Sequence, residues 1–229
     1  MRQDLQNKAS LKCFVLDSQQ LFMDRTVKLL RSKYPKAEIT AVATATNVLN
    51  QISRYKPNLL VMDISVAEKL GEISSTNTGI QLLKKIMQNY PQLNIVVQSA
   101  QIQKLVRIKP EINAHCGGFT VADKSLSSAE LSKRIEWALQ GFIHTKDIPY
   151  INSLLQVTPE CLKLLNLAFQ EGLQDKVIAQ HIFVSERMVR HYWDRLQTAL
   201  GIDGDELKRQ GKNLRIITQI RAREVGLID

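Results

Sequence analysis

The sequence has few cysteines and no long run of apolar residues. No stretch of about 18 consecutive apolar residues occurs, so we expect no membrane-spanning helix. The N-terminal residues Met-Arg-Gln-Asp-Leu-Gln-Asn-Lys lack the apolar core of a secretory signal. Cys13, Cys116 and Cys161 are odd in number and show no metal-ligand spacing. They favour reduced, buried thiols in a cytoplasm over disulfides or zinc ligands.

Length and composition indicate two ordinary domains. The chain has 229 residues, and hydrophobic residues make up 44% of it, which is enough for two cores. We expect an N-terminal tail at 1–9, an α/β domain at 10–143, a linker at 144–156 and a small all-α domain at 157–229. The linker has few apolar positions, and Asp147-Ile-Pro149 is typical of a hinge.

The net charge of +9 is compatible with an anionic partner, but it is unevenly distributed. Residues 1–147 contain 20 Lys and Arg against 12 Asp and Glu, whereas residues 148–229 contain 11 against 10. The C-terminal part is therefore almost neutral. Any binding of nucleic acid by this part must rest on the local placement of a few cations, namely Lys176, Arg187, Arg190 and Arg195.

Apolar runs alternate with amphipathic segments in the first half of the chain. The runs typical of short strands are 11–16, 38–43, 58–62, 94–99 and 118–121. The segments with helical spacing are 20–33, 46–54, 79–90, 101–109 and 127–139. This repeat predicts a doubly wound, five-stranded parallel sheet with helices on both faces. Ligands bind such sheets beyond the carboxyl ends of the strands.

Four reactive side chains stand at or beyond the predicted strand ends. Asp17 follows the first strand and Asp63 the third, while Ser99 ends the fourth and Lys124 lies beyond the fifth. Two carboxylates, a hydroxyl and an ammonium at one rim predict a phosphorylation pocket. In such a pocket carboxylates hold Mg²⁺ and one Asp attacks phosphorus. The alternative is that each residue is an ordinary cap or turn residue.

Residues 175–200 are typical of a helix-turn-helix. The positions that recur at helical spacing and can be buried are Ile178, Ala179, Ile182, Val189, Leu196 and Leu200. Val184 fits the turn. Ser185 is suited to cap the second helix, because its hydroxyl can accept a backbone N–H.

The opposite face of this second helix is polar and carries Arg187, Arg190, His191 and Asp194. Such a helix can enter the major groove of DNA and present Arg to guanine edges and phosphates. The alternative is an amphipathic helical hairpin whose charged face is only solvated.

The segment 157–202 resembles the LuxR-type output domain of response regulators of the NarL/FixJ class. The matching segments are Val157-Thr158-Pro159-Glu160, Gln170-Glu171-Gly172-Leu173, Ile178-Ala179, Val184-Ser185-Glu186-Arg187, Val189-Arg190 and Leu200-Gly201-Ile202. The resemblance implies binding of double-stranded DNA. The residues expected at the DNA are Lys176, Ser185, Arg187, Met188, Arg190, His191 and Arg195.

This segment departs from the family's pattern at several positions. Met188 stands where the family has Thr, and Tyr192 stands where it has His. Cys161 and Val177 replace two Glu residues that join a polar network behind the second helix. Their joint replacement predicts apolar packing in place of that network.

The first half of the chain resembles the receiver domain of the same regulators. The likeness is carried by Leu16-Asp17-Ser18-Gln19-Gln20-Leu21-Phe22, Met62-Asp63-Ile64-Ser65 and Gly118-Phe119-Thr120-Val121-Ala122-Asp123. It implies Asp63 as the phosphoacceptor, Ser99 as the hydroxyl that senses the phosphoryl group and Phe119 as a switch aromatic. It also implies a sensor histidine kinase, or another regulatory protein, as partner.

The predicted pocket departs from the receiver pattern in two ways. Ser18 replaces one of the two acids that hold the metal, so Asp17 and Asp63 should bind Mg²⁺ weakly. When Gly118–Asp123 is aligned with the family's pattern, Ala122 stands where the family has the Lys of the pocket. Lys124 can take its place only if the strand end shifts by two residues.

The sequence also predicts the structure of three further segments. After Asp63 the chain is longer than the family's pattern, and we expect an exposed loop at 66–78 beside the pocket. Residues 203–205 are typical of a turn. Residues 213–225 have helical spacing and predict a helix that closes the small domain or forms a homodimer contact.

Together these features predict a homodimeric, DNA-binding transcription regulator with an atypical phospho-receiver centred on Asp63. Two alternatives remain open. In the first, the receiver works without phosphorylation; in the second, the chain is a protein-interaction adaptor that no longer binds DNA. An enzyme is not expected, because no nucleophile–base or metal constellation occurs outside the strand ends.

Overall fold

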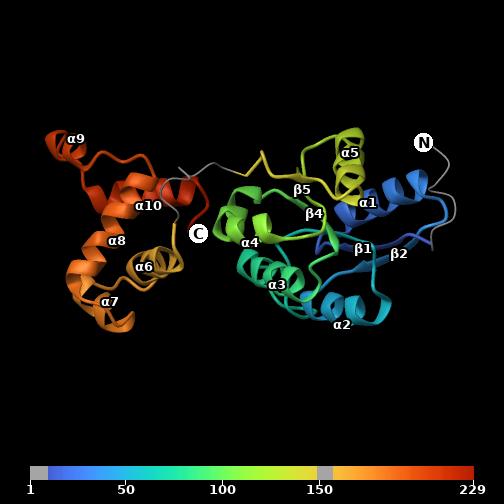
Figure 1. Cartoon of the computed structure of the whole chain (residues 1–229), viewed down its shortest axis with the longest axis horizontal. Helices are drawn as coiled ribbons and strands as arrows, with labels where there is room; N and C mark the ends of the chain where they lie inside the picture. Colours follow the sequence, from blue (N-terminus) through green and yellow to red (C-terminus); the bar gives the residue numbers. More distant parts are fainter. Residues whose placement is uncertain (1–9, 149–156) are drawn as a thin grey trace. The chain divides into compact units, whose positions relative to one another are not determined.

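The structure is a computed structural model that describes residues 10–148 and 157–229. Contacts divide the chain into two compact units between Ile148 and Pro149. We call them the α/β domain and the helical domain and describe each by itself (Figure 1). The predicted tail at 1–9 lies outside the described residues, as does part of the predicted linker, 149–156.

The α/β domain is built on one parallel sheet. Its strands are β1 (Lys12–Leu16), β2 (Glu38–Val42), β3 (Leu59–Met62), β4 (Asn94–Ser99), β5 (Phe119–Asp123) and β6 (Ile143–His144). Their order is β2-β1-β3-β4-β5-β6, and all neighbouring pairs are parallel. The doubly wound parallel fold is thus confirmed. The prediction of five strands is wrong by one, because β6 adds to the edge of β5.

Side-chain contacts attach β6 and the residues that follow it to the α/β domain, although the sequence-based prediction begins a linker at residue 144. His144 stacks against Trp137 with 5.0 Å between ring centroids, and its ring also hydrogen-bonds with Arg134. The Arg134 guanidinium donates to Asp147 Oδ2 at 2.9 Å. Residues 144–148 therefore pack with the α/β domain.

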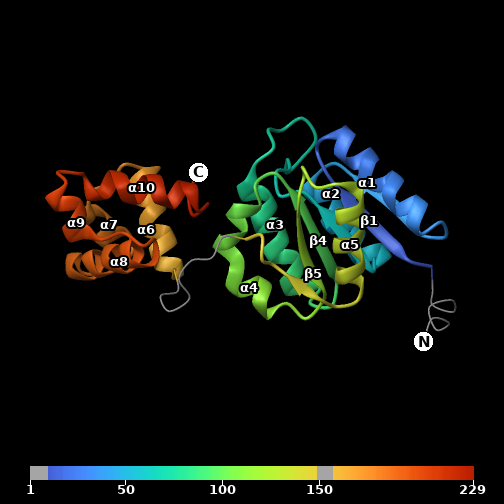
Figure 2. The same ribbon diagram turned by 90° about the horizontal axis from the view of Figure 1, so that it is seen from above.

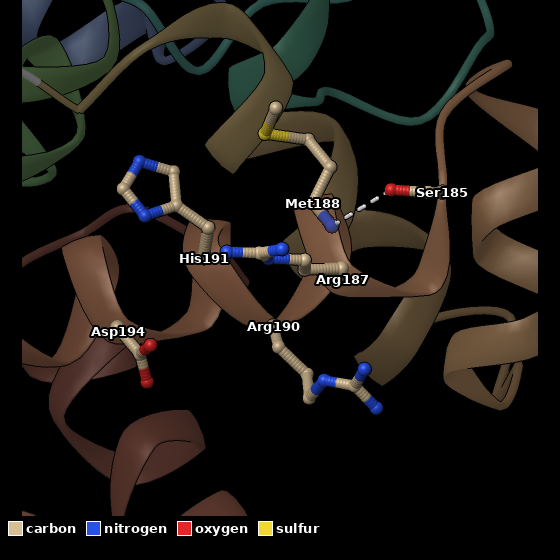
Figure 3. Close-up of a pocket in the computed structure, with 6 residues that line it drawn as sticks. All are labelled: Ser185, Arg187, Met188, Arg190, His191 and Asp194. Carbon is tan, nitrogen blue, oxygen red and sulfur yellow. Dashed lines mark hydrogen bonds between the residues drawn. The ribbon is translucent and has the colours of Figure 1, made fainter.

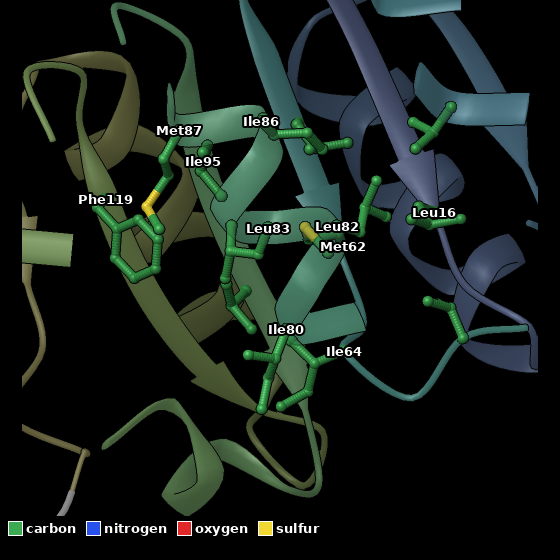
Figure 4. Close-up of a cluster of buried hydrophobic side chains, with 14 of the residues drawn as sticks. Leu16, Met62, Ile64, Ile80, Leu82, Leu83, Ile86, Met87, Ile95 and Phe119 are labelled. Atoms are coloured by element: carbon green, nitrogen blue, oxygen red, sulfur yellow. The ribbon is translucent and has the colours of Figure 1, made fainter. Parts of the chain in front are cut away.

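Helices cover both faces of the sheet (Figures 1 and 2). One face carries α1 (Gln20–Lys33) and α5 (Ser128–Leu139), and the other carries α2 (Ala45–Tyr55), α3 (Thr76–Asn89), a 3₁₀ segment (Ile102–Ile108) and α4 (Lys109–Ala114). Strand side chains alternate between the two cores. Phe14 and Leu16 join the core under α2 and α3, a cluster shown with Leu16 labelled in Figure 4. Cys13 and Val15 join the core under α1 and α5. Burial on both faces explains why the strands are continuously apolar.

Two helical segments differ from the sequence-based prediction. The helix predicted at 101–109 is a 3₁₀ segment that ends at Ile108, and α4 follows it because Pro110 fits only the first turn of a new helix. The loop predicted at 66–78 ends earlier, since Ser75 caps α3 by accepting the N–H of Asn77. A β-bridge between Val66 and Ser75 closes the base of this loop.

The helical domain contains α6 (Pro159–Phe169), α7 (Asp175–His181), α8 (Glu186–Ala199), α9 (Gly204–Arg209) and α10 (Leu214–Glu224). Its buried core includes Leu164, Leu165, Ile178, Val189 and Leu196. The predicted helix-turn-helix is confirmed as α7 and α8, and α10 matches the helix predicted at 213–225. The turn predicted at 203–205 is wrong, because Asp203 caps α9 through the N–H groups of Asp205 and Glu206.

All three cysteines are free, and the predicted burial is confirmed for two of them. Cys13 and Cys161 are buried, but Cys116 is exposed. Burial raises the pKa of the Cys13 thiol to about 12. Within residues 10–148 and 157–229, every helix is too short or too polar to cross a membrane.

The substitution Gly79→Ala tests how closely α3 packs against the chain just after β3. A Cβ at this position would lie 1.9 Å from the carbonyl oxygen of Ile64. We therefore expect Gly79→Ala to lower the free energy of unfolding by about 3 kcal/mol, although alanine normally favours a helix. Urea unfolding of the full chain measures the change.

Gly204→Ala is the matched control, because the nearest atom to its Cβ, Leu214 Cδ2, is 3.5 Å away. This variant should stay within about 0.5 kcal/mol of the wild type. Equal stability of the two variants would show that α3 can move away from β3.

Candidate nucleic-acid interface and carboxylate pocket

The exposed face of α8 is oriented by a capped turn. Ser185 Oγ accepts the N–H of Met188 at 3.2 Å, which confirms the predicted N-cap. Val189, Trp193 and Leu196 bury the opposite side of the helix. Leu200, which the sequence also assigns to this side, is half-buried. The turn and one apolar face therefore fix which side chains point outward.

Six residues of this region line one open hollow, shown in Figure 3: Ser185, Arg187, Met188, Arg190, His191 and Asp194. Residues 187, 190, 191 and 194 share a face because they lie three, four and seven positions apart. Within the helical domain as described, the side chains of Arg187 and Arg190 form no hydrogen bond or ion pair, so both guanidinium groups are available to a partner. Lys176 on α7 is exposed, and Arg195 is half-buried.

A polar and aromatic network lies behind α8, where the sequence predicts apolar packing. Trp193 Nε1 donates to Asp175 Oδ1 at 3.0 Å, and Arg215 Nη2 donates to both oxygens of Asp175 at 2.7 and 2.9 Å. The Arg215 guanidinium also lies over the Trp193 ring, 4.4 Å from its centroid. This contact set links α7, α8 and α10, and the prediction of an apolar replacement is wrong.

Cys161 and Val177, which stand where the family pattern has Glu, have different surroundings. Cys161 is 1% exposed, and its Sγ lies 3.5 Å from Thr158 Oγ1 and 4.0 Å from the carbonyl oxygen of Tyr192. Val177 is 37% exposed. The network of Asp175, Trp193 and Arg215 was not predicted, because the prediction was based on positions 161 and 177 alone. The spacing of Trp193 four residues after Val189 was the available signal.

The carboxyl ends of the strands bring Asp17, Asp63 and Lys124 together in one place, which we call the carboxylate pocket. Lys124 Nζ lies 2.8 Å from Asp17 Oδ2 and 2.7 Å from Asp63 Oδ2. It reaches them because β5 continues to Asp123, two residues beyond the predicted end. Ala122 is buried in the core under α1 and α5. The shift that Lys124 needs to enter the pocket is therefore present.

Both oxygens of Asp63 are engaged. Ser99 Oγ donates to Asp63 Oδ1 at 2.6 Å, the N–H of Ser65 donates to the same oxygen at 3.0 Å, and Oδ2 pairs with Lys124. Asp17 Oδ1 accepts the N–H of Gln19 at 2.8 Å. Burial raises the pKa of Asp17, and the contacts with Lys124 and Gln19 oppose that rise.

The structure separates two other predicted residues from the carboxylates. Ser18 is exposed, and its Oγ donates to the carbonyl oxygen of Ser65 at 3.1 Å. Phe119 is fully buried in the core under α3, edge-on to His115 with 6.4 Å between ring centroids. A second aromatic residue lies closer to the charges, because Lys124 Nζ is 4.4 Å from the centroid of Phe22. Phe22 is not among the site residues predicted from the sequence.

The donor set of the carboxylate pocket does not fit a tightly bound Mg²⁺ ion. Mg²⁺ needs several oxygen ligands in a nearly octahedral arrangement. In the described residues, no group of three or more His, Cys, Asp or Glu comes together. The ammonium of Lys124 already bridges the two carboxylate oxygens that would face a cation. The internal Lys and a divalent cation would therefore compete for the same oxygens.

Comparison with known proteins gives one similar sequence and several similar folds. No family model matches the chain. The chain is 25% identical to the "Uncharacterized transcriptional regulatory protein YhcZ" of Bacillus subtilis (strain 168) over 172 residues, which cover 70% of this chain and 75% of that protein.

Solved structures of RcsB, a NarL/FixJ-family response regulator, are similar over both domains. The structure of two RcsB dimers bound to two parallel DNAs has a TM-score of 0.56 at 16% identity and covers 93% of this chain and 100% of that chain. An RcsB–DNA complex has a TM-score of 0.56 at 17% identity and covers 94% and 98%. RcsB of Salmonella typhimurium has a TM-score of 0.51 at 16% identity and covers 86% and 95%.

The chain has the fold of a two-domain response regulator. Its α/β domain has the fold of a receiver, and its helical domain has the fold of a helix-turn-helix output domain. The resemblance to the NarL/FixJ class, first based on short motifs, is confirmed at the level of the fold. The carboxylate pocket occupies the strand ends of this receiver fold, and the exposed face of α8 belongs to its output domain.

Lys124→Met tests whether the Lys124 ammonium takes the place of a metal ion. The side chains of Lys124, Asp17 and Asp63 are 6%, 5% and 3% exposed. Removing the cation leaves two buried carboxylates without a counterion, and we expect a loss of about 3–5 kcal/mol in EDTA. Excess Mg²⁺ should restore part of this stability to the variant and change the wild type little, as measured by urea unfolding.

Lys133→Met is the control, because Lys133 pairs with Glu130 on the exposed surface of α5. Its stability should match the wild type with and without Mg²⁺. Stabilisation of the wild type by Mg²⁺ to the same extent as Lys124→Met would show that Lys124 and the ion do not compete.

Proposed function

We propose that the chain is a cytoplasmic transcription regulator that binds double-stranded DNA through α8. The observation that carries this proposal is the exposed face of α8, on which Arg187, Arg190 and His191 project together from a helix capped at Ser185. The network of Asp175, Trp193 and Arg215 supports it by holding the buried side of the same helix. A rigid support of this kind keeps the three side chains aligned toward one groove.

Each side chain of the proposed contact set has a distinct expected role. Arg190 lies in the middle of the exposed face and is suited to pair with the edge of a guanine, which has two acceptors in the major groove. Arg187 and His191 flank it on the same face. Lys176 on α7 is placed for a phosphate, because the first helix of such a motif crosses the DNA backbone. Met188 and Arg195 complete the proposed contact set.

Arg190→Ala tests base recognition. Losing one good Arg–guanine pair should cost about 1–3 kcal/mol on the preferred sequence and much less on random duplex. The preferred sequence is first selected from a random DNA pool, and the two affinities are then measured at one fixed salt concentration. An equal loss on both duplexes would make Arg190 a phosphate contact.

Arg209→Ala is the matched control, because Arg209 is an exposed arginine on α9. Its affinity for both duplexes should stay near that of the wild type. If the wild type enriches no sequence from the pool, the chain is an adaptor that acts through protein contacts. Residues 148–229 have almost no net charge. Comparing Arg190→Ala with Arg209→Ala therefore separates a local contact from an effect of the domain's total charge.

We also propose that the chain acts as a homodimer through α10. Ile216 and Ile220 are 54% and 46% exposed, and they lie one helical turn apart on the same face. Two such faces bury apolar surface when they meet across a two-fold axis. A dimer would place two copies of α8 on two half-sites of one duplex.

For the α/β domain we propose an atypical phospho-receiver centred on Asp63. The support is the convergence of a carboxylate, the Ser99 hydroxyl and the Lys124 ammonium at the strand ends. A sensor histidine kinase, or a small acyl phosphate, would supply the phosphoryl group. Before Asp63 attacks phosphorus, one oxygen must leave either Lys124 or Ser99. This requirement makes phosphorylation slow.

A phosphorylation-independent receiver is the second candidate. It is favoured by Lys124, whose ammonium pairs with both Asp17 and Asp63, and by Ser18, which supplies no charge for a metal. In this case the α/β domain is governed by protein partners or by dimerisation.

Intact mass after incubation with acetyl phosphate and Mg²⁺ distinguishes the two candidates. We expect the wild type to gain one phosphoryl group slowly, as an Asp63 oxygen displaces acetate from phosphorus. Asp63→Asn should gain none, because the amide is not a nucleophile. Asp123→Asn, at the end of β5, is the control and should behave as the wild type. No added phosphoryl mass on the wild type would favour the phosphorylation-independent receiver.

A further inference from the structure

Phe183, in the turn between α7 and α8, combines two features that are unfavourable in a folded protein. Its φ is +57°, in the left-handed region that side chains with a Cβ rarely adopt. Its side chain is also 93% exposed, so the ring has almost no contact with the helical domain. Neither feature stabilises this turn. The exposed ring is therefore available to a partner of the helical domain.

The same domain shows how it normally closes a helix. At the ends of α8, α9 and α10, the residue after the C-cap has a positive φ, and it is Gly201, Gly211 and Gly226 respectively. Glycine is the usual residue at this position because it has no Cβ to strain.

The hydrogen bonds at α7 follow the same pattern as those at the other helices. Phe183 N donates to Gln180 O at 3.3 Å, and Val184 N donates to Ala179 O at 2.9 Å. The end of α8 is closed in the same way, by Gly201 N to Thr198 O and Ile202 N to Gln197 O. Phenylalanine therefore occupies a position where this chain uses glycine three times.

The turn that carries Phe183 leads directly into α8. Only Val184 separates it from Ser185, which caps the helix and lines the same hollow as Arg187 and Arg190. When the N-terminal part of a recognition helix enters the major groove, the residues just before it come close to the sugar-phosphate backbone. A flat apolar ring at this point matches the apolar face of a deoxyribose.

We propose that Phe183 is a DNA-contact residue that packs its ring against the sugars of the backbone beside the groove. This inference rests on the proposed DNA binding by α8. The ring contributes affinity without reading sequence, because every nucleotide carries the same sugar. It thereby adds an apolar contribution to an interface on a domain with little net charge. The strained backbone at Phe183 is the cost of placing the ring there.

The test uses two variants of the full chain, Phe183→Gly and Phe183→Asn. Both residues tolerate a positive φ, so the midpoint of thermal unfolding of the helical domain should rise. Affinity for DNA should fall about tenfold, the order expected when an aromatic side chain is no longer buried at an interface. The factor should be similar for the selected sequence and for random duplex.

Gly211→Phe is the matched control, since it places the same side chain at the same type of helix closure on α9. A Cβ at Gly211 meets nothing within 4 Å, so the strain comes from its φ of +67° alone. We expect the unfolding midpoint to fall and the affinity for both duplexes to stay at the wild-type value. A gain in affinity would mean that any exposed phenylalanine on this domain promotes binding, which would overturn the proposal.

Two further results would also overturn it. If the wild type binds duplex DNA and both Phe183 variants bind it equally well, the ring makes no DNA contact, while DNA binding by α8 stands. If the variants bind more tightly than the wild type, the ring hinders the approach of the duplex instead of contacting it. Failure of the wild type to bind any duplex would overturn the proposed function together with this inference.

Discussion

The α/β domain depends on the balance between one buried ammonium and two buried carboxylates. An isolated buried charge is strongly unfavourable, and Lys124 Nζ lies within 3 Å of an oxygen of both Asp17 and Asp63, which gives the two carboxyl groups a shared counterion. These three residues follow three different strands of the sheet. Any movement of β5 relative to β1 and β3 therefore disturbs the charge balance, which couples the chemistry of the pocket to the shape of the sheet edge.

In the helical domain, polar contacts hold α8, a helix that has only one apolar face. Asp175 accepts hydrogen bonds from both Trp193 and Arg215, and Arg215 also covers the Trp193 ring. A carboxylate that accepts several donors is satisfied without water, and the stacked guanidinium shields the ring. This arrangement holds α7, α8 and α10 in one orientation and leaves the cationic face of α8 toward solvent.

The sequence predicts those parts of the fold that depend on local pattern. The parallel sheet follows from its apolar runs, the helix-turn-helix from its spacing and from the cap at Ser185, and the place of Asp63 from a strand end. The position of Lys124 could not be predicted so directly, because β5 extends to Asp123 only through pairing with Ser99 at the end of β4. The edge strand β6 and the network at Asp175 also depend on partners distant in sequence.

The unequal burial of the three cysteines has a practical consequence. Cys13 and Cys161 are shielded from solvent, and the raised pKa of Cys13 keeps that thiol protonated, whereas Cys116 is exposed. A maleimide dye should therefore attach to the native chain at one position on the α/β domain, just before β5. The unmodified sequence thus provides a single labelling point for fluorescence studies, without the need to remove or introduce a cysteine.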